Sequence, residues 1–178
     1  MTDSMTPSNA RFFAWMAVAA TVVAADQVTK WAIVEWIALY DSVTVNSFIN
    51  LTHQRNTGAA FSFLAGAGGW QRWFFVALAS IVSVVIVIWL WRLRSERNVL
   101  LGGGLSLVLG GAIGNLIDRI AHGYVTDFVQ VWFGDWAYPS FNVADAGISV
   151  GAAMLIIDAL FFSGRNEVAA DSDPDSSS

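Results

Sequence analysis

The sequence predicts a membrane protein: a bundle of four transmembrane α-helices with a small β-sheet on the outer membrane surface. Of its 178 residues, 56% are hydrophobic and only 13% are charged, whereas about a quarter of the residues of a soluble domain are charged. Four apolar stretches approach the ~20 residues that a helix needs to cross a bilayer. Between them lie segments in which polar and apolar residues alternate, as in half-buried strands.

The four spans are expected at about residues 12–31, 73–91, 99–117 and 143–162. Arg11 and small residues give the first span some features of a cleaved signal peptide, which is an alternative. Its apolar run is longer than that of a typical signal, and removing it would leave an odd number of spans. Gly110 and Gly114 in the third span, and Gly147 and Gly151 in the fourth, have the small-residue spacing typical of close helix packing.

Basic residues indicate the orientation of the bundle. Arg92, Arg94 and Arg97 crowd the short connection between the second and third spans, which predicts a cytoplasmic loop. An even number of spans then places both termini on the cytoplasmic side. We expect residues 1–165 to form a single integral-membrane domain, and the acidic, serine-rich residues 166–178 to form a disordered cytoplasmic tail.

The long outer segment between the first two spans, about residues 34–69, is too long for a simple connection. Residues 42–46 and 48–52 alternate as strands do, and so does a second outer segment, about residues 124–132. We therefore expect a small sheet lying on the outer membrane surface. Trp132, Trp136 and Tyr138 are expected beside it at the depth of the lipid headgroups.

Composition excludes several kinds of chemistry. The chain has no cysteine, so it has no disulfide, no thiolate nucleophile and no cysteine-ligated metal. Its two histidines, His53 and His122, are too few and too far apart to indicate a zinc site. We expect no metal, no cofactor and no nucleic-acid partner.

Polar and charged residues gather at one depth, near the outer ends of three spans. Because such residues are costly inside a membrane, each is a candidate for function. They are Asp26 and Lys30 in the first span, Asn115, Asp118 and Arg119 at the end of the third, Asp127 just beyond it, and Asn142 and Asp145 at the start of the fourth. This convergence is the strongest functional signal that the residues themselves provide.

Some of these residues have a simpler structural explanation. For Asp118, an ion pair with Arg119 or a contact at the helix end is favoured over catalysis. Asp26 is expected to accept hydrogen bonds from backbone amides of the outer loop. Asp158, near the inner end of the fourth span, is interpreted as an interfacial charge.

Asn142 or Asp145 could simply cap the start of the fourth span. Asp127 is harder to explain structurally, because it interrupts an apolar, strand-like run. Two neighbouring carboxylates share one proton, since both cannot ionise at short range. One can then act as a base on water while the other polarises a peptide carbonyl. A serine/lysine protease using Ser62 and Lys30 is an alternative, but no spacing joins those two residues.

Four sequence blocks carry a resemblance to a known family. They are Asp26–Lys30, Asn56–Ser62, Gly110–Arg119 continuing through Gly123–Phe128, and Phe141–Asp145. In content and order they resemble the lipoprotein signal peptidases, also called signal peptidase II or prolipoprotein signal peptidase (aspartyl protease family A8). The resemblance covers nearly the whole chain apart from its tails.

The resemblance implies an aspartic endopeptidase of the bacterial inner membrane, with its active site near the periplasmic face. Such an enzyme cleaves the signal peptide from diacylglyceryl-modified prolipoproteins just before the lipidated cysteine. The resemblance also implies a β-cradle on the outer surface, contact with membrane lipid and inhibition by globomycin-type cyclic peptides. We expect a monomer, although the sequence itself does not reveal the oligomeric state. The resemblance assigns the catalytic pair to Asp127 and Asp145. It assigns substrate binding or site support to Asn56, Gly58, Arg119, Asn142, Asp26, Asn115 and Asp118.

Three other functions stay open from the residues alone. A proton- or ion-coupled transporter also uses buried aspartates, but usually near the bilayer midplane and with inverted repeats. In a membrane scaffold the acids would only hold the bundle together. Another intramembrane aspartyl protease class would require a Gly-x-Gly-Asp signature, whereas Asp41 follows Tyr40 in a predicted loop.

Overall fold

The computed structural model describes residues 9–58 and 69–161. Within these residues, four helices are long and apolar enough to cross a membrane. They are α1 (Asn9–Trp36), α2 (Trp70–Arg92), α3 (Val99–Ala121) and α4 (Val143–Phe161). A short 3₁₀ turn, η2 (Leu93–Ser95), follows α2. The predicted four-helix bundle is therefore confirmed.

The helices extend beyond the predicted spans mainly at the end of the bundle that carries the sheet. There α1 continues to Trp36, α2 already begins at Trp70, and α3 continues to Ala121. The apolar runs predicted only the part of each helix that matches the bilayer core. Polar residues such as Asp118 and Arg119 continue the helix while they take part in other contacts.

Helix α3 is the centre of the bundle. It packs against the other three helices, and 56% of its apolar window is buried, against 17% or less in the others. Glycines allow this closeness: a Cβ added at Gly104 would lie 2.9 Å from the carbonyl oxygen of Gly151, and one added at Gly110 would lie 2.7 Å from that of Ala19. The close packing predicted from the glycine pattern is present.

Two apolar clusters hold the described part of the chain together. One lies inside the helix bundle and consists of Ala19, Ile86, Leu90, Leu93, Leu105 and Leu109. The other lies where α1 meets the sheet and consists of Ile33, Ile37 and Phe128. Inside the membrane such side chains stabilise the bundle through close van der Waals packing, because lipid chains are as apolar as the side chains themselves. The second cluster fixes the sheet to the end of the first helix.

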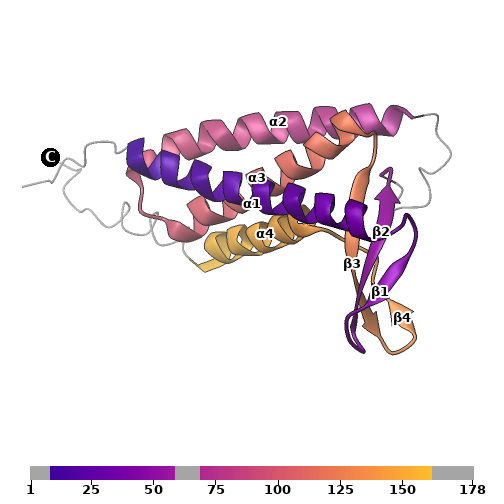
Figure 1. Ribbon diagram of the computed structural model, residues 1–178. Helices are drawn as coiled ribbons and strands as arrows, with labels where there is room; N and C mark the ends of the chain where they lie inside the picture. The colour runs from indigo at the N-terminus through magenta and orange to yellow at the C-terminus, as the bar shows by residue number, and fades with distance from the viewer. Residues whose placement is uncertain (1–8, 59–68, 162–178) are drawn as a thin grey trace, which may run out of the picture.

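The predicted sheet is confirmed as four antiparallel strands in the order β1-β2-β3-β4. They are β1 (Ser42–Thr44), β2 (Ile49–Asn56), β3 (Val125–Phe133) and β4 (Trp136–Ala137). The sheet lies at one end of the bundle, and the start of α1 and the end of α4 lie at the other (Figure 1).

Strand β2 is longer than predicted because its alternation breaks in the middle. Its register with β3 shifts between Leu51 and Gln54. At this irregularity two successive residues, Thr52 and His53, are both buried, at 2% and 4% exposure. An extra residue in one strand interrupts the two-residue period. The strand then continues to Asn56, where it contributes to the candidate site.

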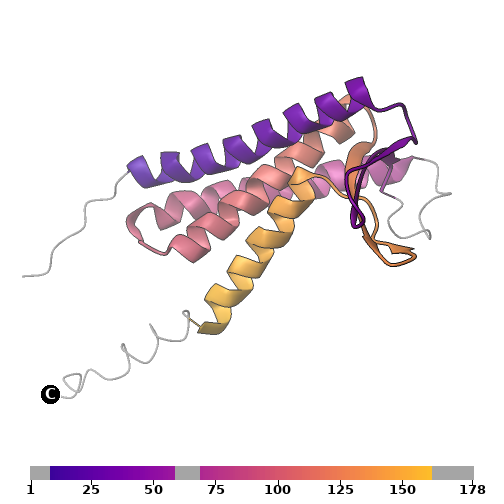
Figure 2. The same ribbon diagram turned by 60° about the horizontal axis from the view of Figure 1, so that its bottom comes forward.

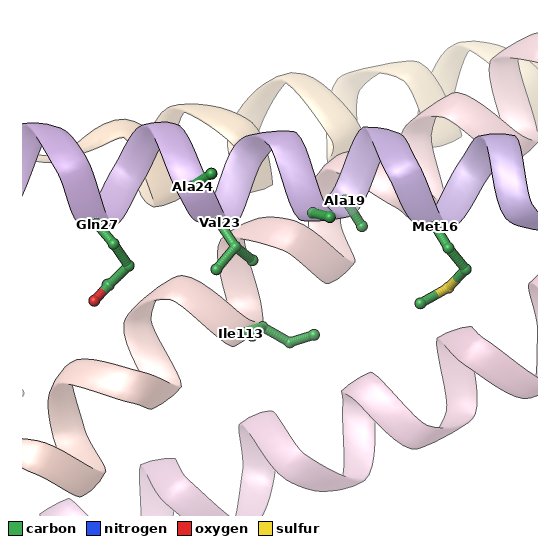
Figure 3. Close-up of a pocket in the computed structure, with 7 residues that line it drawn as sticks. Met16, Ala19, Val23, Ala24, Gln27 and Ile113 are labelled. Atoms are coloured by element: carbon green, nitrogen blue, oxygen red, sulfur yellow. The ribbon is translucent and has the colours of Figure 1, made fainter.

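An apolar groove of about 380 Å³ lies between α1 and α3. Figure 3 shows Met16 and Val23 of α1 pointing toward the side on which Ile113 of α3 lies, and Ala19 and Ala24 complete the lining from α1. Gln27 is the one polar residue in its lining. A surface of this kind suits contact with lipid chains.

Some expectations lie outside the described residues. They are the disordered tail at 166–178, Ser62 and the second half of the Asn56–Ser62 block. Asp158 is described, and it differs from a simple interfacial charge. Its side chain is 4% exposed and accepts a 2.6 Å hydrogen bond from Asn98 Nδ2 at the end of the bundle away from the sheet.

Candidate active site

Helix α4 begins with a reciprocal cap formed by Asn142 and Asp145. The Asn142 Oδ1 accepts a hydrogen bond from the backbone N–H of Asp145 at 2.9 Å, and the backbone N–H of Asn142 donates to Asp145 Oδ2 at 3.2 Å. This is the geometry of a capping box, which satisfies two otherwise unpaired donors. The predicted capping role is confirmed, and it holds the Asp145 carboxylate at the first turn of α4.

Asp127 lies on β3 and is 3% exposed. Its Oδ1 accepts a 2.7 Å hydrogen bond from Asn142 Nδ2, and its Oδ2 accepts a 2.9 Å hydrogen bond from Asn56 Nδ2. Asn56 is in turn oriented by the backbone N–H of Gly58, which donates to Asn56 Oδ1 at 2.8 Å. Gly58 has φ +96°, a left-handed conformation that suits glycine.

Two asparagine amides link the two aspartates. Asn142 contacts both acids, as described above, and is 0% exposed. Asn115 on α3 donates from Nδ2 to Asp145 Oδ1 at 2.7 Å and accepts from Asn142 Nδ2 at 3.2 Å. The two carboxyl groups therefore belong to one hydrogen-bonded network built from β3, α3 and α4.

A buried ionic cluster contacts this network through Asn115. The Lys30 Nζ lies 2.7 Å from Asp26 Oδ2, 3.0 Å from Asp118 Oδ2 and 3.1 Å from Asn115 Oδ1. Lys30, Asp26 and Asp118 are each at most 4% exposed. Removing one partner of such a cluster leaves an uncompensated buried charge, which is strongly destabilising.

Two predicted partners are wrong. Asp118 pairs with Lys30 rather than with Arg119, and it also accepts a 3.1 Å hydrogen bond from the backbone N–H of Thr126. Asp26 accepts its backbone hydrogen bond from Ala144 at 2.9 Å, in the first turn of α4 and not in the outer loop. Both carboxylates therefore join elements that are distant in sequence, which local spacing cannot predict.

Gln27 is a site residue that the sequence prediction missed, and Lys30 was named as a candidate without a role in the site. Gln27 donates from Nε2 to Asp118 Oδ1 at 3.0 Å and to Asp26 Oδ2 at 3.2 Å. A signal for Lys30 was available, because it follows Asp26 by four residues and therefore lies on the same face of the helix. Gln27 gave no comparable signal.

Asp145 is half-buried and lines two apolar grooves. One groove, of about 300 Å³, lies between α2, α3 and α4, and its polar lining residues are Asn115, Arg119 and Asp145. The other, of about 280 Å³, runs along α4 beside Tyr138 and Phe141. Figure 2 shows α4 diverging from α1 and α2 as it runs away from the sheet. A carboxylate at the end of apolar grooves can meet a polar bond of an otherwise apolar ligand.

The environment of Asp127 favours its protonated form. The pKa of Asp127 is raised from 3.8 to about 6. Burial is the largest cause and the charge of Asp145 acts in the same direction, while hydrogen bonds from Asn56 and Asn142 and the charge of Lys30 oppose the rise. A carboxyl group in this range can both accept and donate a proton near neutral pH. Among the described residues, no cluster of three His, Cys, Asp or Glu is placed to hold a metal ion.

Comparison with known sequences identifies similar proteins. A family model described as "Signal peptidase (SPase) II" matches residues 18–161. The lipoprotein signal peptidase of Alteromonas mediterranea is 47% identical over 147 residues, which cover 82% of this chain and 79% of that protein. The lipoprotein signal peptidase of Hydrogenovibrio crunogenus is 47% identical over 169 residues, which cover 95% of this chain and 96% of that protein.

Two solved structures, both described as bacterial membrane enzymes, are also similar. The first, at 1.9 Å resolution, has a TM-score of 0.71 and 33% identity, and covers 84% of this chain and 94% of its own. The second, at 2.3 Å resolution, has a TM-score of 0.70 and 32% identity, and covers 83% of this chain and 87% of its own. The likeness therefore extends over the four-helix architecture as well as the sequence.

Proposed function

This chain belongs to the signal peptidase II family, and from that premise we propose that Asp127 and Asp145 are the catalytic pair of its peptidase reaction. The protein is a multi-pass membrane peptidase that cleaves the signal peptides of prolipoproteins in lipoprotein maturation. The single observation that carries the assignment is the Asn142 side chain and backbone, which contact both carboxylates.

In the proposed mechanism the two carboxyl groups share one proton. The ionised member takes a proton from water, and the resulting hydroxide attacks the carbonyl carbon of the scissile peptide bond. The protonated member donates a hydrogen bond to the carbonyl oxygen and stabilises the charge that develops there. The proton taken from water then passes to the leaving amine. Asn115 and Asn142 keep the two acids in position throughout.

The grooves beside Asp145 support a lipid-linked substrate. A signal peptide crosses the membrane as an apolar helix, and the groove between α2, α3 and α4 offers apolar walls from Val82 and Val108 up to Asp145. We take the substrate to be a prolipoprotein carrying a diacylglyceryl group, cut just before the modified cysteine. Its acyl chains then stay in lipid while the scissile bond reaches the acids. Globomycin-type cyclic peptides would occupy the same site.

The same proposal includes an orientation. Arg92, Arg94 and Arg97 lie at the end of the bundle opposite the sheet, together with the start of α1 and the end of α4 (Figure 1). The positive-inside rule then places both termini in the cytoplasm and the sheet on the periplasmic side of the inner membrane. Both acids and their supporting residues come from one chain, so a single chain carries the complete proposed site, and we take the enzyme to act as a monomer.

The decisive experiment is cleavage of a diacylglyceryl-modified prolipoprotein in liposomes by the wild type, Asp127→Asn and Asp145→Asn. Asparagine keeps the size of the side chain and one of the two hydrogen-bond acceptors of each acid, but it neither accepts nor donates the catalytic proton. Both variants should fold and lose activity. Asp135→Asn is the matched control, because Asp135 is exposed in the hairpin between β3 and β4. Near-normal activity in either Asp127→Asn or Asp145→Asn would show that the acids have a structural role and not a catalytic one.

A further inference from the structure

Phe75, in the second turn of α2, contacts two separate parts of the candidate site. A Cβ added at Gly58 would lie 2.6 Å from Cε2 of the Phe75 ring, so the Gly58 backbone lies directly against that ring. The guanidinium carbon of Arg119 lies 4.9 Å from the centroid of the same ring. Phe75 also lines the groove that ends at Asp145.

The first contact leads to Asp127. Gly58 follows β2 in a left-handed conformation, and its N–H holds the side-chain oxygen of Asn56 at 2.8 Å. This hydrogen bond turns the Asn56 amide so that its NH₂ group donates to Asp127 Oδ2 at 2.9 Å. The Phe75 ring thus supports the backbone that orients one of the two hydrogen-bond donors of Asp127.

The second contact helps to determine where the half-buried positive charge of Arg119 lies. Within the described residues, both ion pairs closer than 4.0 Å are formed by Lys30, so Arg119 has no carboxylate at that distance. Its described side-chain contacts are the Phe75 ring and a 3.4 Å hydrogen bond to the carbonyl oxygen of Asn115. A cation over an aromatic face gains about 0.5–2 kcal/mol, more when water is excluded.

The backbone of Arg119 is held from the same helix. Arg72, one turn before Phe75, donates from Nε to the carbonyl oxygen of Arg119 and from Nη2 to that of Ile120, both at 2.8 Å. Helix α2 therefore fixes the end of α3 through Arg72, and the direction of the Arg119 side chain through Phe75. These are separable tasks, since one involves carbonyl groups and the other an aromatic face.

We propose that Phe75 is a positioning residue of the peptidase, whose ring holds the Gly58–Asn56 arm and the Arg119 guanidinium in register with Asp127 and Asp145. The inference rests on the proposed catalytic pair. It predicts that Phe75 affects the turnover of bound substrate more than the folding of the bundle. The ring is half-buried and does not belong to the main apolar cluster in α1, α2 and α3.

The test compares Phe75→Leu with Phe75→Tyr in liposomes on a diacylglyceryl-modified prolipoprotein. Leucine removes the aromatic face, and we expect kcat to fall about tenfold or more while KM and thermal unfolding change little. Tyrosine keeps the face and should retain most of the activity. Phe74→Leu is the matched control, because Phe74 is 50% exposed and its ring meets that of Phe75 edge-on at 5.4 Å.

A pH profile separates positioning from a general loss of structure. The groups acting on Asp127 are Asn56 from β2, Asn142 just before α4, Asp145 in the first turn of α4, and Lys30 from α1. Arg119 on α3 also interacts electrostatically with Asp127. The Asn56 hydrogen bond lowers the pKa of Asp127. In Phe75→Leu that bond is less well aligned, so the limb of the kcat profile that follows the titration of Asp127 should move to higher pH. Phe75→Tyr and Phe74→Leu should leave the limb where it is.

A double variant tests the contact with Gly58 directly. In Gly58→Ala the new methyl group collides with the Phe75 ring and also strains the left-handed backbone at φ +96°. Adding Phe75→Leu relieves the collision and leaves the backbone strain unchanged. The two effects on kcat should therefore be less than additive. Strict additivity, an unshifted pH limb, or equal kcat for Phe75→Leu and Phe74→Leu would each overturn the positioning role. Asp127→Asn is measured alongside. If it is inactive while the Phe75 variants behave normally, the proposed catalytic pair stands and only the positioning role of Phe75 fails.

Discussion

Asn142 combines two tasks that are usually given to separate residues. Its side-chain oxygen caps α4 by accepting from the N–H of Asp145, and its side-chain NH₂ donates to Asp127. One residue thus fixes the start of a helix and the relative position of both acids. Any substitution of Asn142 should therefore affect stability and catalysis together.

Asn142→Ala should lower kcat about a hundredfold, the usual magnitude for losing one preorganised donor. It should also cost about 1 kcal/mol from the lost cap. Asn98→Ala is the matched control: Asn98 caps α3 by accepting from the N–H of Leu101 and donates to the buried Asp158, far from the two acids. It should lower the unfolding temperature but not kcat. Equal losses of kcat in both variants would contradict the bridging role.

The pKa of about 6 for Asp127 makes stability depend on pH. Because the folded-state pKa is raised above the ordinary value, its protonated form is favoured by folding, and this stabilisation is lost as pH rises through about 6. The unfolding temperature of the wild type should therefore fall between about pH 4 and pH 7 more than that of Asp127→Asn. Identical slopes would show that Asp127 is not perturbed.

Activity should follow the coupled titration of the pair. We expect a bell-shaped profile, because one acid must be ionised and the other protonated. One limb should lie near pH 6, where Asp127 titrates. A rate that does not change across the acidic range would contradict a shared proton.

At the scale of elements, the close contact between α3 and α4 depends on glycine. A Cβ at Gly111 would collide with the carbonyl oxygen of Ala144, in the first turn of α4. Gly111→Ala should therefore displace that turn, which carries Asp145, and destabilise the fold by about 1–3 kcal/mol. Gly147→Ala is the milder comparison, since its Cβ would lie 3.2 Å from Val22 Cγ1. Cleavage and thermal unfolding of the two variants should differ clearly.

Helices were predictable from the sequence because each has one dominant physical cause. Apolar runs of bilayer length specify a transmembrane helix without reference to any other part of the chain. Strand β2 was predicted only to Thr52, because its register shift breaks the alternation on which the prediction depended. The predicted helices were shorter than the observed ones for a related reason. Hydropathy detects the part of a helix that lies in the membrane core and not its full length.

The site was predictable as a gathering of polar residues, but not as a set of contacts. Depth in the membrane can be read from position along a span, and it placed Asn115 and Asp145 together correctly. Asp26 joins α1 to Ala144 of α4, and Asp118 joins α3 to Thr126 of β3. Such pairings depend on how helices rotate against each other, and no local pattern contains that information.

At the scale of the whole molecule, the absence of cysteine from the sequence allows a direct test of orientation. Asp135→Cys and Glu96→Cys introduce single thiols at exposed positions, one in the β3–β4 hairpin and one beyond η2. In spheroplasts, a membrane-impermeant maleimide should label Asp135→Cys, and it should label Glu96→Cys only after lysis. The reverse pattern would place the acids on the cytoplasmic side and exclude the proposed substrate.

Lys30 is the only lysine in the sequence, and it is buried between two carboxylates. Amine-reactive reagents therefore meet a protein whose single side-chain amine is charged and out of reach while the ionic cluster is intact. Acylation of Lys30 would therefore report the opening of that cluster, because no other lysine side chain is present to react. The same arrangement protects the peptide bond after Lys30 from lysine-specific proteases. The rate of cleavage at that bond would therefore report how often this part of the protein unfolds.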